Sequence, residues 1–246
     1  MAATAFFVFI GWFIGGFVSG ISGFGAMMLA LPILSLGLPP LEAILTCCIV
    51  AAPCCMQLAW LYRKYVYWPD MKWLWIGCIP GCILGTLTLK MVPVGWLQIG
   101  ISILICIFLA MHIFGNKTSF TIKDSAMSLF ITGCASGFTN SSVSIVGVPM
   151  GIFVLLKHWD KDRARGTMTM FFLLSSLITV AVQSCSGLYT MHLLAISAIG
   201  TAGCFIGQYL GFIVGKRITQ SIFVKFALCF LACAAAMLFM KGVANM

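Results

Sequence analysis

Long apolar runs separated by short connectors dominate this chain and restrict it to a membrane fold. Of its 246 residues 62% are hydrophobic and only 8% are charged, whereas soluble domains carry charge on about 25% of residues. Because a transmembrane helix needs about 20 mostly apolar residues, about ten such segments with their connectors use the whole chain. Runs such as 99–110 lack the alternation of apolar and polar residues that β-barrel spans require. The sequence therefore predicts an all-α polytopic membrane protein.

Glycine, proline and charged residues divide the chain into two comparable halves, 1–116 and 117–246. The expected segments are 4–19, 24–36, 41–62, 71–89 and 94–114 in the first half, and 125–138, 143–156, 166–182, 190–212 and 218–240 in the second. Each half opens with two short segments interrupted by small polar residues and continues with three longer ones. We therefore predict a single membrane domain of two repeats, each a broken or short helix pair followed by three transmembrane helices (8–10 segments in total).

The charges of matching loops indicate that the second repeat is inverted relative to the first. The loop 37–40 is uncharged while its counterpart 157–165 is basic, and the loops near 63–64 and 183–190 show the reverse. By the positive-inside rule this places both termini outside. The cytoplasmic side then receives Arg63, Lys64, Lys72, Lys117, Lys123, Lys157, Lys161, Arg163, Arg165, Lys216, Arg217 and Lys225, and the outside Lys90 and Lys241. The net charge of +9 orients helices, so we expect no nucleic-acid partner and membrane lipids around the protein.

Short, glycine-interrupted segments at matching places of an inverted repeat are typical of the binding site of a secondary transporter. A helix that begins inside the membrane leaves its first N–H groups unpaired at the positive end of its dipole, and a bound anion satisfies them. We expect two opposed helix N-termini, near 22–25 and near 140–144, to hold a small anion at the midplane without a cofactor or a metal. The candidate site residues are Ser19, Gly20, Ser22, Gly23, Phe24, Gly25, Asn140, Ser141, Ser142 and Ser144, with Arg165 drawing anions to the cytoplasmic mouth.

Three other functions remain open. An anion channel fits the same architecture. The run Gly20-Ile21-Ser22-Gly23 has the form of the nucleophile turn of rhomboid-like intramembrane proteases, with His192 as the base. A soft-metal transporter would use Cys47, Cys48, Cys54 and Cys55 with Met27 and Met28, although cysteines in apolar runs behave mostly as small hydrophobic residues. Glycines such as Gly81, Gly85, Gly203 and Gly207 favour close helix packing.

Several motifs together resemble one transporter family. They are the opening run 16–25 with Pro32, its counterpart at 135–149, the span start Ala164-Arg165-Gly166-Thr167, the Gly81-x-x-x-Gly85 and Gly203-x-x-x-Gly207 helices, and the run 215–218. In this order and spacing the chain resembles the sulfite exporter TauE/SafE (TSUP) family over nearly its whole length.

The resemblance implies transport of small sulfur-containing or organic anions, such as sulfite, sulfonates or sulfoacetate, across the bacterial cytoplasmic membrane. It adds Thr167 to the candidate substrate-binding residues and allows a homo-oligomer. Phe24, Met27 and Met28 stand where the family pattern has more glycine. They make one wall of the site more apolar, which favours an organosulfur anion with an apolar tail.

Overall fold

A computed structural model describes residues 2–34, 37–93, 125–144, 147–157, 159–217 and 220–244, together with single positions between 95 and 110. All regular elements in these ranges are helices. They are α1 (Ala2–Ser22), α2 (Ala26–Leu34), α3 (Pro40–Tyr62), the 3-10 turn η1 (Arg63–Tyr65), α4 (Trp68–Met91), α6 (Ala126–Val143), α7 (Gly147–Leu156), α8 (Lys161–Cys185), α9 (Met191–Gly215) and α10 (Gln220–Ala244). Most of the fifth expected segment, 94–114, lies outside the described residues.

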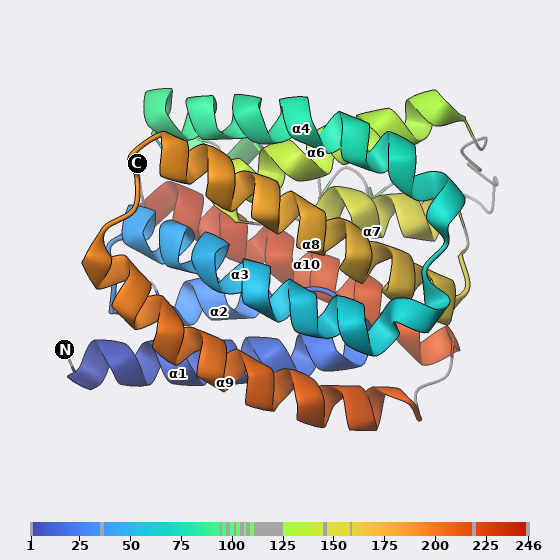
Figure 1. The fold of residues 1–246 in the computed structure, drawn as a ribbon, viewed down its shortest axis with the longest axis horizontal. Helices are drawn as coiled ribbons and strands as arrows, with labels where there is room; N and C mark the ends of the chain where they lie inside the picture. The colour runs from blue at the N-terminus through green and yellow to red at the C-terminus, as the bar shows by residue number, and fades with distance from the viewer. Residues whose placement is uncertain are drawn as a thin grey trace.

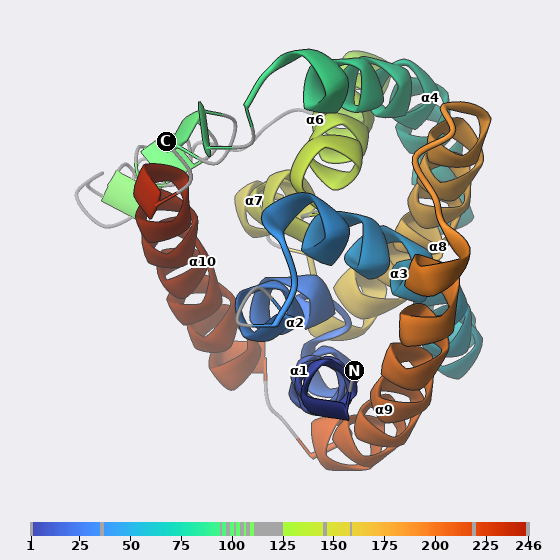
Figure 2. The same cartoon turned by 90° about the vertical axis from the view of Figure 1, so that its left-hand side faces the viewer.

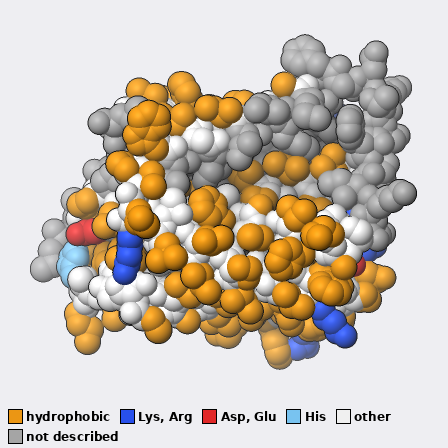
Figure 3. Space-filling view, turned by 90° about the horizontal axis from the view of Figure 1, so that it is seen from above, with side chains coloured by type: hydrophobic (Ala, Val, Ile, Leu, Met, Phe, Trp, Pro, Cys, Tyr) orange, Lys and Arg blue, Asp and Glu red, His pale blue; other side chains and the backbone are white. Residues whose placement is uncertain are grey.

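The long helices have the length and composition of membrane spans. Among the described residues, five stretches qualify: Thr4–Ser22, Leu41–Tyr65, Trp68–Met91, Lys161–Cys185 and Met191–Gly215. A helix of 24 residues such as α4 is about 36 Å long, enough to cross a hydrocarbon core of about 30 Å. On the described part of the face seen in Figure 3, apolar side chains cover the middle while the charged side chains in view lie toward the two ends. The predicted all-α polytopic membrane fold is confirmed.

The helices form two sets that run in opposite directions (Figure 1). Along α1 and α9 the contacts advance together, from Gly16 beside Cys204 to Ile21 beside Gly215, so these two helices are parallel. Helices α4 and α6 are parallel in the same sense, with Gly77 beside Phe130 and Gly85 beside Phe138. Helices α3 and α8 are antiparallel.

Two contacts define the antiparallel pairing of α3 and α8. Tyr65, just after α3, lies against Gly166 near the start of α8, whereas Cys55 accepts a hydrogen bond from Ser176 further along. Helices α1 and α6 also run in opposite directions (Figure 1), so both pairs of corresponding helices, α1 with α6 and α3 with α8, are reversed. The basic residues Arg63, Lys64, Lys161, Arg163 and Arg165 belong to the shared end of α3 and α8, and Lys90 to the other end of the bundle.

Glycine allows the two parallel pairs to pack backbone to backbone. A Cβ on Gly16 would lie 2.6 Å from the Cys204 carbonyl oxygen, and one on Gly85 would lie 2.5 Å from that of Phe138. Glycines at every fourth position line the contacts: Gly203, Gly207, Gly211 and Gly215 on α9, and Gly77, Gly81 and Gly85 on α4. Without a hydrophobic driving force between helices in lipid, such close approach is what holds a pair together. The packing role expected for these glycines is confirmed.

The short helices α2 and α7 lie inside the ring of long helices, between α10 on one side and α3 and α8 on the other (Figure 2). Helix α2 has 9 residues and α7 has 10, about half the number needed to cross the membrane. Helix α2 folds back along α1, because Gly15 lies against Ala26 and Gly11 against Leu34. It therefore begins beside the middle of α1.

The helix breaks come later in the chain than the sequence suggested. We expected the first segments of the two halves to end at Ser19 and Phe138, but α1 continues to Ser22 and α6 to Val143. The hydroxyl groups donate to carbonyls three or four residues earlier: Ser19 to Gly16, Ser22 to Val18, and Ser142 to Phe138. Because the polar groups are satisfied within the helix, they continue it instead of ending it.

Candidate functional site

The chain breaks its helical path between α1 and α2 (the first break) and between α6 and α7 (the second break), and the two breaks meet in the interior of the bundle. A Cβ built on Gly147, the first residue of α7, would lie 3.5 Å from the ring of Phe24, which lies just before α2. Both residues are buried. The starts of α2 and α7, whose first N–H groups have no partner within their own helices, are therefore neighbours. The sequence placed the second of these helix starts near 140–144, whereas in the structure α7 begins at Gly147.

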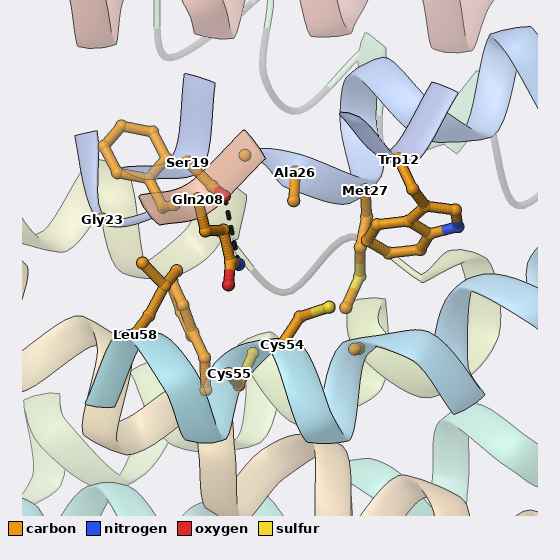
Figure 4. A pocket seen from close by; sticks show the side chains of 14 residues that line it. Trp12, Ser19, Gly23, Ala26, Met27, Cys54, Cys55, Leu58 and Gln208 are labelled. Carbon is orange, nitrogen blue, oxygen red and sulfur yellow. Dashed lines mark hydrogen bonds between the residues drawn. The ribbon is translucent and has the colours of Figure 1, made fainter. Parts of the chain in front are cut away.

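A small internal cavity opens beside this meeting point (Figure 4). Its lining comes from α1, α2, α3, α8 and α9 and from both breaks: Trp12, Ser19, Gly23, Phe24, Gly25, Ala26, Met27, Ala51, Cys54, Cys55, Leu58, Gly147, Phe172 and Gln208. The volume of about 30 Å³ holds two or three waters at about 10–15 Å³ each on this scale. In this conformation the cavity accommodates only a very small ligand.

Glycine shapes the wall of the cavity at the first break. Gly23 has φ +83° and Gly25 has φ +94°, left-handed values that glycine adopts without steric cost. Gly23 also lets α8 come close, because a Cβ there would lie 3.1 Å from Cγ of Arg165. The break therefore places backbone, not side chains, next to the cavity.

Arg165 lies directly behind this break. Its side chain is 2% exposed, and its Nη1 donates to the Gly215 carbonyl at 3.2 Å. Its other neighbour of note is the Asp162 carboxylate, at 3.9 Å on the surface side. Arg165 is not among the residues that line the cavity. The atoms of Arg165 that contact Gly23 are Cα, Cβ and Cγ, so the aliphatic part of this side chain packs behind the break.

The second break is filled by a hydrogen-bonded network. The Asn140 amide nitrogen donates to Ser175 Oγ and Thr179 Oγ1, both at 3.0 Å, and Ser141 Oγ lies 2.9 Å from Thr179 Oγ1. Ser144, at φ 59°, donates to the Ile44 carbonyl and contacts the Cys48 thiol. These side chains are all buried, and among the described residues only Asn140 Oδ1 of this group has no hydrogen-bond partner.

A comparison with protein families identifies the chain. The model of the sulfite exporter TauE/SafE family matches residues 8–238, nearly the full length. The chain belongs to this family. Searches among curated proteins and among solved structures gave no match. Membership of the TauE/SafE family indicates membrane transport of sulfite or a related anion, and the family is one of transporters, not of enzymes. The resemblance inferred from the motifs is confirmed.

Four of the residues expected from the TauE/SafE resemblance and the helix-end argument line the cavity: Ser19, Gly23, Phe24 and Gly25. Others serve contacts elsewhere. The Gly20 carbonyl accepts from the Tyr62 hydroxyl at 2.8 Å, and the Thr167 hydroxyl accepts from the Tyr67 amide at 3.1 Å. Ser22 donates within 2.9 Å to the Val18 carbonyl and also contacts that of Phe24.

One expectation about the second half is wrong. Asn140, Ser141 and Ser142 belong to the last turns of α6, at the negative end of its dipole, and do not cap a helix N-terminus. The physical reason is again that the hydroxyl groups bond inside the helix and extend it. The N-terminus that takes part in the meeting point is that of α7 at Gly147.

The structure separates the two residues that the protease alternative would need, whereas Met27, Cys54 and Cys55, named for the soft-metal alternative, line the cavity together. Ser22 ends α1, whereas His192 lies in the first turn of α9; because these helices are parallel, the two side chains lie near opposite ends. Among the described residues, no three His, Cys, Asp or Glu side chains come together as metal ligands.

Sequence reasoning missed Gln208, Phe172 and the apolar wall formed by Trp12 and Leu58. Only Gln208 carried a signal, since an amide inside the apolar run 190–212 must find a polar partner in the membrane.

Proposed function

We propose that the protein moves small sulfur-containing anions of the sulfite or sulfonate type across the bacterial cytoplasmic membrane. The anion binds where α2 and α7 begin, with Ser19, Gly23, Phe24 and Gly25 around it. The meeting of the two helix starts beside a buried cavity is the observation that carries this proposal. Uncompensated N–H groups in a place without bulk water bind an anion well.

Arg165 and the basic end of the bundle support an anionic substrate. Arg165 is buried against the first break, and several further basic side chains lie at the same end of the molecule. We propose that this end faces the cytoplasm and attracts anions to the mouth of the pathway. Substrate contacts of Gly20, Ser22, Asn140, Ser141, Ser142, Ser144 and Thr167 stay predictions.

We also propose that residues 1–116 and 117–246 are inverted repeats with both termini outside. The opposite directions of α1 and α6, and of α3 and α8, support this arrangement. Single cysteines at positions 38 and 160, in a background without the native cysteines, should react with an impermeant thiol reagent from opposite sides of the membrane. Labelling of both positions from one side would contradict the inverted topology.

Flux into liposomes tests the function directly. Purified protein should transport radiolabelled sulfite or a small sulfonate with a rate that saturates at high substrate concentration, and protein-free liposomes give the background. A conductance that does not saturate would favour an anion channel. Cleavage of a membrane-protein substrate without any flux would favour the protease alternative.

A further inference from the structure

Gln208 places a hydrogen-bond acceptor inside the cavity. Its side chain is 1% exposed, and its amide nitrogen donates to Ser19 Oγ at 3.3 Å. The amide oxygen, Oε1, is fully buried and has no hydrogen-bond partner among the described residues. Since nearly all buried polar side-chain atoms in proteins have a partner, an unpaired acceptor that lines a cavity indicates a ligand that donates.

The hydrogen bonds of Ser19 determine which way the amide points. The hydroxyl of Ser19 has one proton, and it donates this proton to the Gly16 carbonyl at 2.9 Å. Ser19 Oγ must therefore accept from Gln208, which turns the NH₂ group toward Ser19 and leaves the oxygen free. Figure 4 shows this oxygen directed away from Ser19, toward the wall formed by Leu58, Cys55 and Cys54.

The neighbouring polar groups do not satisfy this oxygen. The indole nitrogen of Trp12 is on the side of the ring that faces away from Gln208 (Figure 4). The Cys55 sulfur accepts a hydrogen bond from Ser176 at 3.7 Å. The cavity lining thus includes the starts of α2 and α7, whose first N–H groups have no partner within their own helices, and one unpaired acceptor on α9.

We propose that, among the sulfur anions of the proposed function, the cavity prefers those that still carry a proton they can donate over sulfonates, whose acid group carries none, with Gln208 Oε1 as the specificity-determining acceptor. This inference rests on the proposed function, because it assumes that the cavity is the anion site. The oxygens of the anion face the helix starts while its hydroxyl group donates to Gln208. Hydrogensulfite, in its hydroxyl form, is the smallest sulfur anion with this pattern, whereas the sulfite dianion has only acceptors and would be repelled. One proton then travels with each anion without any titrating protein side chain.

An isosteric pair of ligands tests the inference. Methanesulfinate has the shape and single charge of hydrogensulfite, with a methyl group in place of the hydroxyl. Binding of both to the purified protein is measured by calorimetry at acidic pH, where hydrogensulfite predominates. The parent protein should prefer hydrogensulfite about tenfold, the size of one hydrogen bond of about 1.4 kcal/mol. Gln208→Leu should bind the two equally, with the affinity for hydrogensulfite reduced about tenfold.

The outcomes separate the two proposals. Equal binding of both ligands by the parent protein, or tighter binding of the dianion at alkaline pH, would overturn the role of Gln208 and leave anion transport standing. Failure of the parent protein to bind either ligand would overturn the cavity as anion site, and this inference with it. The ligand comparison on the parent protein decides the matter even if Gln208→Leu does not fold.

Discussion

The two helix breaks have the same position in their halves but different interiors. At the first, two glycines with positive φ expose backbone to a cavity, and Arg165 lies behind them. At the second, Asn140 and its hydroxyl neighbours fill the interior with mutual hydrogen bonds. The first break therefore borders a cavity, whereas the second lies beside side chains that hydrogen-bond to one another. We infer that the first supplies most of the ligand contacts, while the second holds the α7 N-terminus in place.

The two breaks share one feature, a hydrogen bond from a neighbouring helix to a carbonyl near the helix end. In each half, the third helix donates a hydrogen bond to a carbonyl near the end of the first: Tyr62 to Gly20 at 2.8 Å, and Gln183 to Ser141 at 3.1 Å. Such bonds satisfy carbonyls that a helix end leaves unpaired. The two breaks thus share this hydrogen bond, and the side chains around them differ.

The largest effect, a loss of folded yield, should come from the glycines where α1 and α6 pack against their partner helices. Gly20→Ala and Gly137→Ala would both direct a Cβ into the backbone of the partner helix, for example within 2.6 Å of the Cys78 carbonyl oxygen at Gly137. We expect both variants to lose most of their folded yield, measured by gel filtration in detergent. Gly151→Ala, where a Cβ meets nothing within 4 Å, is the matched control and should purify normally. A normal yield of either packing variant would contradict the close helix pairing.

A negative charge at the first break should weaken anion binding strongly. Ala26 begins α2 and its Cβ points into the cavity (Figure 4). Ala26→Asp should still fold, because a carboxylate is favourable in the first turn of a helix. It should weaken anion binding at least about a hundredfold, since like charges about 4 Å apart repel by about 4 kcal/mol at an effective dielectric constant near 20. Calorimetry with the isosteric, uncharged Ala26→Asn as control measures the charge effect alone; parent-like affinity of the Asp variant would place the anion elsewhere.

A substitution in the second break should change stability more than affinity. Asn140→Ala removes the donor of two hydrogen bonds and leaves buried hydroxyl groups with fewer partners. We expect a loss of about 1–3 kcal/mol of stability, seen as a lower unfolding midpoint, with anion affinity within a factor of two or so of the parent. A tenfold weaker affinity at unchanged stability would instead support the ligand role predicted for Asn140 from the sequence.

The smallest effect should come from the outer edge of the second break. The Tyr189 hydroxyl, in the connection between α8 and α9, donates to the Gln183 side chain at 2.6 Å. Burial raises the pKa of Tyr189, so the folded protein holds the phenol proton more tightly than the unfolded chain does. The substitution Tyr189→Phe should lower the free energy of unfolding by about 1 kcal/mol. The stability that Tyr189 contributes is present below its ordinary pKa of about 10 and is lost as pH rises above it.

Unfolding midpoints of the parent and Tyr189→Phe, compared between neutral and strongly alkaline pH, measure this difference. The gap between the two proteins should stay constant up to about pH 10 and narrow beyond it. A gap that widens with pH would mean that the phenol is not the donor to Gln183.

Much of the fold follows from the sequence because the thickness of the bilayer fixes how long an apolar run must be to cross it as a helix. The expected span 41–62 matches α3 at Pro40–Tyr62, and 71–89 falls within α4. The ends of α1 and α6 were misplaced because a serine can end a helix or bond back into it, and the local sequence does not distinguish these cases. The cavity was only half predicted: Gly23 and Phe24 belong to a recognisable motif, but Phe172 and Gln208 reach it through the packing of distant helices.

The pairing of α1 with α9 and of α4 with α6 has a consequence for biosynthesis. Helix α4 meets its glycine-matched partner soon after it enters the membrane, since α6 is the next described helix along the chain. Helix α1 is made first, yet the surface that fits Gly16 and Gly20 lies on α9, near the end of translation. The first helix of the nascent chain must therefore stay available in the bilayer until nearly the whole protein has been inserted. The first half, if released alone, would lack α9, the helix against which α1 packs.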